Sequence, residues 1–169
     1  MAEITIDFVF LASRWLHLSA AIVALGGVAF QRFAFLPSLS GMPEEPRAEL
    51  REAVRKRWAP VVHTCIVVLL ITGGYNFVVL AWPPKIDPIP YHPIFLFKLF
   101  AALAVFFLAT VLVGRGQGFA RLRANIRGTL TGILLLGAFI VLISGILGQV
   151  RAGSGRTKPA SAPALAPSE

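Results

Sequence analysis

The stretch from Phe8 to Phe30 constrains this chain more than any other, because it is an apolar run that carries Arg14 and His17 inside it. At about 1.5 Å of rise per residue, a helix of this length crosses the roughly 30 Å hydrocarbon core of a bilayer. An ionisable side chain within such a span is costly and indicates a functional site. The run therefore predicts a transmembrane helix that does more than anchor the chain.

The face of this helix that carries His17 is small and polar. The residues three, four and seven positions away from His17 are Ser13, Arg14, Ala20, Ala21 and Ala24. Membrane helices pack through small residues and interhelical hydrogen bonds, so we expect Arg14 and His17 to point into a bundle. Two alternatives stay open: Arg14 can reach to the interface, and His17 can hydrogen-bond a carbonyl of the next helix.

The whole chain has the composition of an integral membrane protein, with 56% hydrophobic and 14% charged residues. The predicted spans are about 8–30, 61–82, 94–113 and 128–150. They predict an all-α fold, a four-helix transmembrane bundle with up-down topology. In the fourth span Gly128 and Gly132 form a GxxxG pair, which favours close helix contact but is weakly specific.

Two segments flank these spans. Residues 45–57 carry glutamates early and Lys and Arg late, an order that matches the helix dipole. They predict a cytoplasmic helical extension before the second helix. The tail, residues 151–169, is rich in Ala, Pro and Ser and is predicted to be disordered.

Basic residues set the expected orientation. Ten of the 16 Lys and Arg residues lie in the two segments 32–57 and 115–127, beside the ends of the spans. The positive-inside rule then places these loops in the cytoplasm and both termini outside, in a bacterial-type inner (plasma) membrane. The net charge of +8 is explained by this asymmetry, so no nucleic-acid partner is expected.

Lys98 lies one turn into the third span, on a face of small residues, and should also point into the bundle. By helix rise, His17 and Lys98 differ in depth by roughly 6 Å, whereas His63 lies roughly 15 Å from His17 toward the cytoplasm. We therefore predict that Arg14, His17 and Lys98 share one cavity in the outer half. His63 is read chiefly as an interfacial histidine and is the weaker candidate for a metal ligand.

Several ligands suit such a cluster. A haem needs an axial nitrogen, which His17 offers for the iron, and cationic partners for its propionates, which Arg14 and Lys98 offer. A quinone or an anionic lipid head group would suit the same side chains. Cys65 is the sole cysteine, and neither methionine lies in a span, which excludes a disulfide framework, a thiolate cluster and a thioether path for soft metals.

A resemblance to a known superfamily is carried by three segments, RWLHLSAAIVALGGVAFQRFAFLPSL, RWAPVVHTCIVVLLITGGYNF and YHPIFLFKLFAALAVFFLATVLVGR. They resemble the membrane domains of copper-resistance protein D and the haem-binding type of protoporphyrinogen IX oxidase, over roughly residues 10 to 150. The most specific parts are the His17 helix with its Leu-Pro turn, the Thr72-Gly73 pair, and Lys98. For the oxidase branch the resemblance implies haem b, with an essential histidine and lysine at His17 and Lys98. For the copper branch it implies metal uptake.

Two hypotheses of different classes follow. The chain is either a haem-binding oxidoreductase that oxidises a porphyrin precursor or passes electrons to a quinone, or a non-catalytic membrane subunit. The second class includes a copper or ion transport-like bundle and a bundle whose small-residue faces bind a partner subunit or a second copy. No catalytic residue is identified by the sequence.

Overall fold

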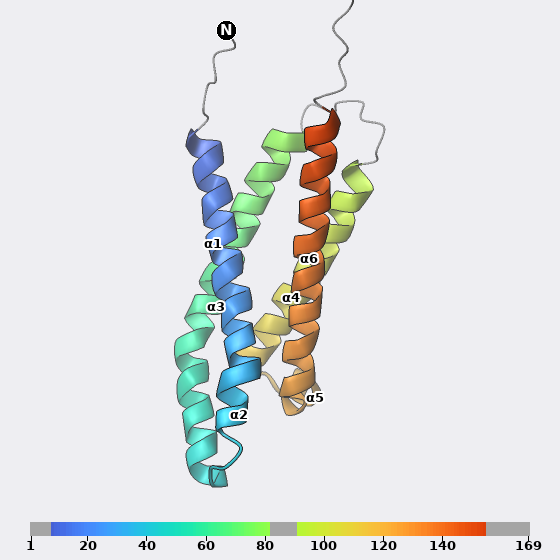
Figure 1. Cartoon of the computed structure of the whole chain (residues 1–169). Helices are drawn as coiled ribbons and strands as arrows, with labels where there is room; N and C mark the ends of the chain where they lie inside the picture. The colour runs from blue at the N-terminus through green and yellow to red at the C-terminus, as the bar shows by residue number, and fades with distance from the viewer. Residues whose placement is uncertain (1–7, 82–90, 155–169) are drawn as a thin grey trace, which may run out of the picture.

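The structure, a computed structural model, describes residues 8–81 and 91–154, and these residues form helices and short connections without a strand (Figure 1). The four long helices are α1 (Phe8–Phe30), α3 (Glu44–Ala81), α4 (Tyr91–Val113) and α6 (Ile126–Ser154). All four are long and apolar enough to cross a membrane. They alternate in direction, which confirms the predicted all-α four-helix bundle of a multi-pass membrane protein.

The first span does not stop at Phe30. It continues without a break into a π-helical turn, η1 (Gln31–Phe35), and a short helix, α2 (Leu36–Ser38). Pro37 lies near the start of α2, where its fixed φ is compatible with the helical backbone. The hydroxyl of Ser40 then donates to the carbonyl of Pro37 at 2.7 Å and helps to close the turn.

The charged segment before the second span is helical, as predicted, and it is continuous with that span. α3 has 38 residues, and at about 1.5 Å per residue it is far longer than the roughly 30 Å hydrocarbon core requires. Pro60 lies inside α3 and the helix continues through it. Residues 82–90, between α3 and α4, and the part of the predicted tail beyond Ser154 lie outside the described residues. The first four residues of that tail, 151–154, were predicted to be disordered but form the end of α6.

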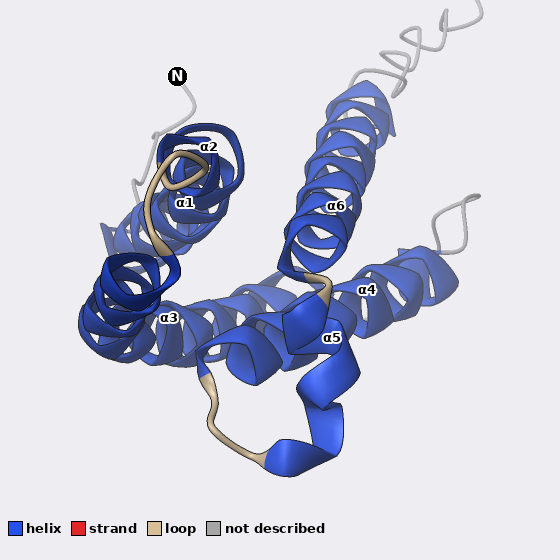
Figure 2. Cartoon of the chain, turned by 90° about the horizontal axis from the view of Figure 1, so that it is seen from below, coloured by secondary structure: helices blue, strands red, loops and turns tan. Residues whose placement is uncertain are grey.

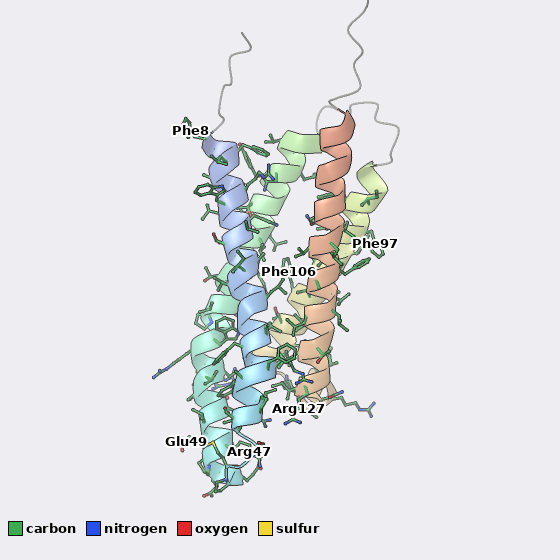
Figure 3. All side chains as sticks on the ribbon, viewed as in Figure 1. Phe8, Arg47, Glu49, Phe97, Phe106 and Arg127 are labelled. Carbon is green, nitrogen blue, oxygen red and sulfur yellow. The ribbon has the colours of Figure 1, made fainter. Side chains whose placement is uncertain are left out.

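The short elements η2 (Gln117–Phe119) and α5 (Ala120–Ala124) connect α4 to α6. They lie at the same end as α2 and the start of α3, seen end-on in Figure 2. We call this the basic end, because it carries the Arg and Lys residues of segments 32–57 and 115–127. Figure 3 shows Arg47, Glu49 and Arg127 at this end and Phe8 at the opposite one.

The most fully buried side chains lie in the basic half of the bundle. A buried cluster joins α1, α2 and α6, with residues of α4 packed against it; its members are Val28, Leu36, Leu130 and Ile133. Leu130 and Ile133 are each only 1% exposed. Because lipid is as apolar as these side chains, the cluster stabilises the bundle through close van der Waals contact.

Two glycines allow helices to approach closely. A Cβ atom at Gly27 of α1 would overlap the indole of Trp58 on α3, and one at Gly137 of α6 would overlap Leu25 of α1. The predicted GxxxG pair behaves differently: nothing lies within 4 Å of a Cβ at Gly132. The close contact of α6 is therefore made one to two turns further along, at Gly137.

The outer surface of α1 is apolar, as the sequence indicated. Trp15 is 68% exposed and Ile22 is 63% exposed. Toward the basic end α1 and its continuation contact α6, through Leu25 against Gly137 and through the Arg32 hydrogen bond to Thr131 at 3.0 Å. From there α1 and α6 diverge toward the opposite end of the bundle (Figure 1).

Candidate functional site

His17 makes a hydrogen bond that defines its chemistry. Its Nδ1 lies 2.8 Å from Thr72 Oγ1 on α3, and the Thr72 hydroxyl donates to the carbonyl of Val68 at 2.6 Å. A hydroxyl has one proton to donate, so Thr72 Oγ1 must accept from His17 Nδ1–H. This pairing assigns the Nδ1–H tautomer to neutral His17. The lone pair of Nε2 is then available to a metal ion or a proton donor.

The backbone of α3 makes room for the imidazole. A Cβ atom at Gly73 would lie 3.3 Å from His17 Cε1, so any larger residue would press on the ring. Ser13 and Ala20, which flank His17 along its own helix, are buried, at 9% and 8% exposure. The small face of α1 is thus turned into the bundle, as its composition predicted.

Lys98 belongs to the same neighbourhood. It lies on α4 with a half-buried side chain, close enough to His17 for the two groups to interact electrostatically. Among the described residues no carboxylate pairs with Lys98. Three helices therefore contribute to this site: α1 with His17, α3 with Thr72, and α4 with Lys98.

Arg14 lies elsewhere. The sequence led us to expect it inside the bundle, but its side chain is exposed and its guanidinium carbon lies 5.6 Å from the ring centroid of Phe10. A residue three positions before His17 is displaced by about 60° around the helix, enough to take it off the buried stripe. The inward position is occupied by Ser13 instead.

His63 is separate from His17. Its side chain is exposed, and its Nδ1 lies 2.7 Å from the carbonyl oxygen of Ala59 on its own helix. His63 and Thr72 are nine positions apart on α3, which corresponds to roughly 13 Å along the axis. Two nitrogen ligands of one metal ion lie only about 4 Å apart. The described residues also contain no group of three or more His, Cys, Asp or Glu side chains that could hold a metal ion.

Two buried polar atoms near the His17 hydrogen bond lack a partner. Ser13 Oγ and Asn76 Oδ1, each one helical turn from His17 or Thr72, make no hydrogen bond within the described structure. Buried polar groups are rarely left unsatisfied, so each is suited to contact a bound polar group. Sequence reasoning did not single out Asn76; an amide in an apolar span four residues after a threonine was the available signal.

An open apolar cavity of about 480 Å³ lies beside these groups, between α1 and α3. Its lining residues are Phe8, Val9, Ala12, Ser13, Leu16, Ile71, Thr72 and Tyr75. Three of these residues carry a hydroxyl group: Ser13, Thr72 and Tyr75. His17 and Lys98 are not among the lining residues, so the cavity adjoins their site at Ser13 and Thr72 and opens to the surroundings of the bundle.

Comparison with known proteins adds no relative to this description. Neither a family model, nor a curated protein, nor a solved structure matches this chain. The resemblance to copper-resistance protein D and to the haem-binding oxidase stays a prediction.

Proposed function

We propose that this membrane protein binds a b-type haem, which His17 Nε2 would hold through the iron. The observation that carries the proposal is the Thr72 hydrogen bond, because it holds the proton on Nδ1 and leaves Nε2 unprotonated. Histidine ligands of metals are commonly held in this way, with the second nitrogen donating to an oxygen that orients the ring. The donor set at His17 therefore fits a haem.

The other residues of the site would bind and orient the group. Gly73 leaves space for the imidazole against α3, and Lys98 supplies an ammonium group for a propionate. Arg14 is a candidate for the second propionate, an assignment that requires its side chain to leave Phe10. When bound, the haem would supply one-electron redox chemistry that these side chains lack.

The apolar cavity between α1 and α3 is suited to bind a redox partner that dissolves in the bilayer, such as a quinone or a porphyrin. This assignment distinguishes an oxidoreductase from the alternative, a non-catalytic subunit or transport-like bundle, which needs no such partner. We assign no residue a catalytic role, since none of the described groups is placed against a substrate.

Haem binding is tested by the absorption spectrum of the purified protein. After expression with ample haem supply and extraction in mild detergent, we expect a Soret band that coelutes with the protein and changes on reduction with dithionite. The pyridine haemochromogen should identify haem b. Protein that lacks haem absorbance under these conditions would contradict the proposal and favour the non-catalytic bundle.

We further propose that the basic end faces the cytoplasm of a bacterial-type inner membrane, with both termini outside. Single cysteines at Glu49 and Gly116 are suited to test this, because both residues are exposed at the basic end. In intact cells, Glu49→Cys and Gly116→Cys should react with a membrane-permeant maleimide and resist an impermeant one. Glu3→Cys, before α1, should react with both reagents, and the native Cys65 is buried. The reverse labelling pattern would invert the topology.

A further inference from the structure

A second cavity lies at the basic end of the bundle, lined by residues of all four long helices together with η1, α2 and α5. Its volume is about 390 Å³, within the range of about 300–1,000 Å³ typical of small-molecule sites. The interior is apolar and includes Val28, Val62, Leu112, Leu130 and Ile133. The polar lining consists of Gln31, Arg51, Glu52, Arg55 and Arg123. Figure 2 looks onto this end.

The negative charge in this lining is already neutralised. Glu52 accepts hydrogen bonds from Arg55 through both carboxylate oxygens, each at 2.7 Å, and a third from Arg115, also at 2.7 Å. Arg55 donates in addition to the carbonyl of Val113, the last residue of α4. These contacts hold Arg55 and Arg115 in place and join α3 to the end of α4.

Two arginines of the lining stay without such contacts. Arg51 of α3 and Arg123 of α5 make no hydrogen bond or ion pair with any residue that the structure describes. With three arginines against one glutamate, the lining carries an excess of positive charge. Guanidinium groups bind phosphate oxygens in a bidentate geometry, which makes this pair suited to a phosphate.

We propose that this cavity binds the phosphate head group of an anionic phospholipid, with Arg51 and Arg123 on the phosphate and the first acyl methylenes in the apolar interior. The apolar interior distinguishes a lipid from free phosphate, because an inorganic ion would leave that space without contacts. The location agrees, since basic pockets between membrane helices bind lipid head groups. Val62 and Thr72 are ten positions apart on α3, so this site lies roughly 15 Å from that of His17.

The π-helical turn η1 gives independent support. It interrupts an otherwise regular helix that begins with α1. Its first and last residues, Gln31 and Phe35, both line the cavity. π-Helical turns are rare and are frequent at functional sites. Here the turn brings an amide and an aromatic ring to one wall of the cavity.

The test uses the purified full-length chain in detergent and in nanodiscs of stated lipid. Binding of phosphatidylglycerol is measured by native mass spectrometry and by the shift in thermal unfolding, against phosphatidylcholine and inorganic phosphate. The cavity variant is Arg51→Gln with Arg123→Gln. The matched control is Lys56→Gln with Arg57→Gln, which removes the same amount of positive charge. Both residues are exposed on α3 and lie outside the cavity lining.

We expect the wild type and the control to retain phosphatidylglycerol, and the cavity variant to bind it roughly tenfold or more weakly, since charge-assisted contacts to phosphate are lost. An equal loss in the control would assign the effect to general surface charge and overturn the site. Equal binding of phosphatidylcholine would do the same. Stabilisation by inorganic phosphate alone, as large as that by the lipid, would overturn the lipid as occupant.

A second variant keeps the test decisive if the double arginine variant does not fold. Ala109→Leu leaves every charge in place and fills part of the apolar interior. We expect it to weaken phosphatidylglycerol binding while the circular dichroism spectrum stays that of the wild type. Unchanged lipid binding in a folded Ala109→Leu protein would contradict an acyl chain in the cavity.

Discussion

Replacing His17 by Ala should abolish the Soret band of the purified protein. The variant removes the imidazole whose Nε2 is left free by the Thr72 hydrogen bond, and His63 is too far along α3 to take its place. The helix itself should persist, since Ala has the highest helix propensity. Absorption spectra of equal amounts of folded protein, recorded oxidised and reduced, measure the result.

Two variants make this outcome interpretable. His63→Ala removes an exposed histidine and should leave the spectrum intact. Thr72→Val removes the hydrogen bond to His17 and keeps a similar shape, so we expect haem affinity to fall by roughly 10- to 100-fold, as for other partners of metal ligands. A His17→Ala protein with an unchanged spectrum would contradict the assignment of His17 as a ligand of the haem iron.

Replacing Gly27 by Ala should destabilise the bundle, although the same change normally stabilises a helix. A Cβ atom at this position would overlap the Trp58 ring, so α1 and α3 must separate or the indole must move. Overpacking of this kind costs about 1–3 kcal/mol. The measurement is unfolding of the detergent-solubilised protein by heat or by SDS, followed by circular dichroism.

The neighbouring glycine is the matched control. Nothing lies within 4 Å of a Cβ at Gly26, so Gly26→Ala should be neutral or should stabilise the protein by up to about 1 kcal/mol. Combining Gly27→Ala with Trp58→Phe should recover part of the lost stability, because the smaller ring vacates the contested space. Equal stability of the two single Ala variants would show that α1 and α3 do not meet at Gly27.

The spans were predictable because membrane helices can be identified in a sequence by their length and apolar composition. The end of the first helix was harder to place, because Gln31 and Arg32 end the apolar run while η1 and α2 extend the helix past Phe30. Close contacts were harder still. The GxxxG pair drew attention to Gly132, yet Gly27 and Gly137 make the contacts, because a glycine motif does not say which face meets a neighbour.

The candidate site was predictable only in part. His17 and Lys98 could be brought together from span depth and small-residue faces, and the structure places them within electrostatic range. The outward position of Arg14 and the tautomer of His17 could not be predicted. Both depend on side-chain directions, which are set by the Phe10 ring and the Thr72 hydroxyl rather than by spacing along the chain.

The cavity at the basic end could not be predicted from the sequence, because its arginines were interpreted as a topology signal. Arg51, Arg55 and Arg123 had been counted among the residues that orient the protein, which is a property of segments and not of individual side chains. The structure shows that all three line one cavity, and that Glu52 pairs with Arg55 but not with Arg51 or Arg123. The predicted topology and the proposed lipid site thus depend on the same residues.

The open apolar cavity between α1 and α3 bears on how molecules reach the His17 region. Both helices are long and apolar enough to cross a membrane, and the cavity opens at their outer surface. A molecule that enters this cavity comes from the hydrocarbon phase and crosses no aqueous layer. Its supply is set by its partition coefficient into the membrane, so even a sparingly soluble compound would meet the protein at a high local concentration.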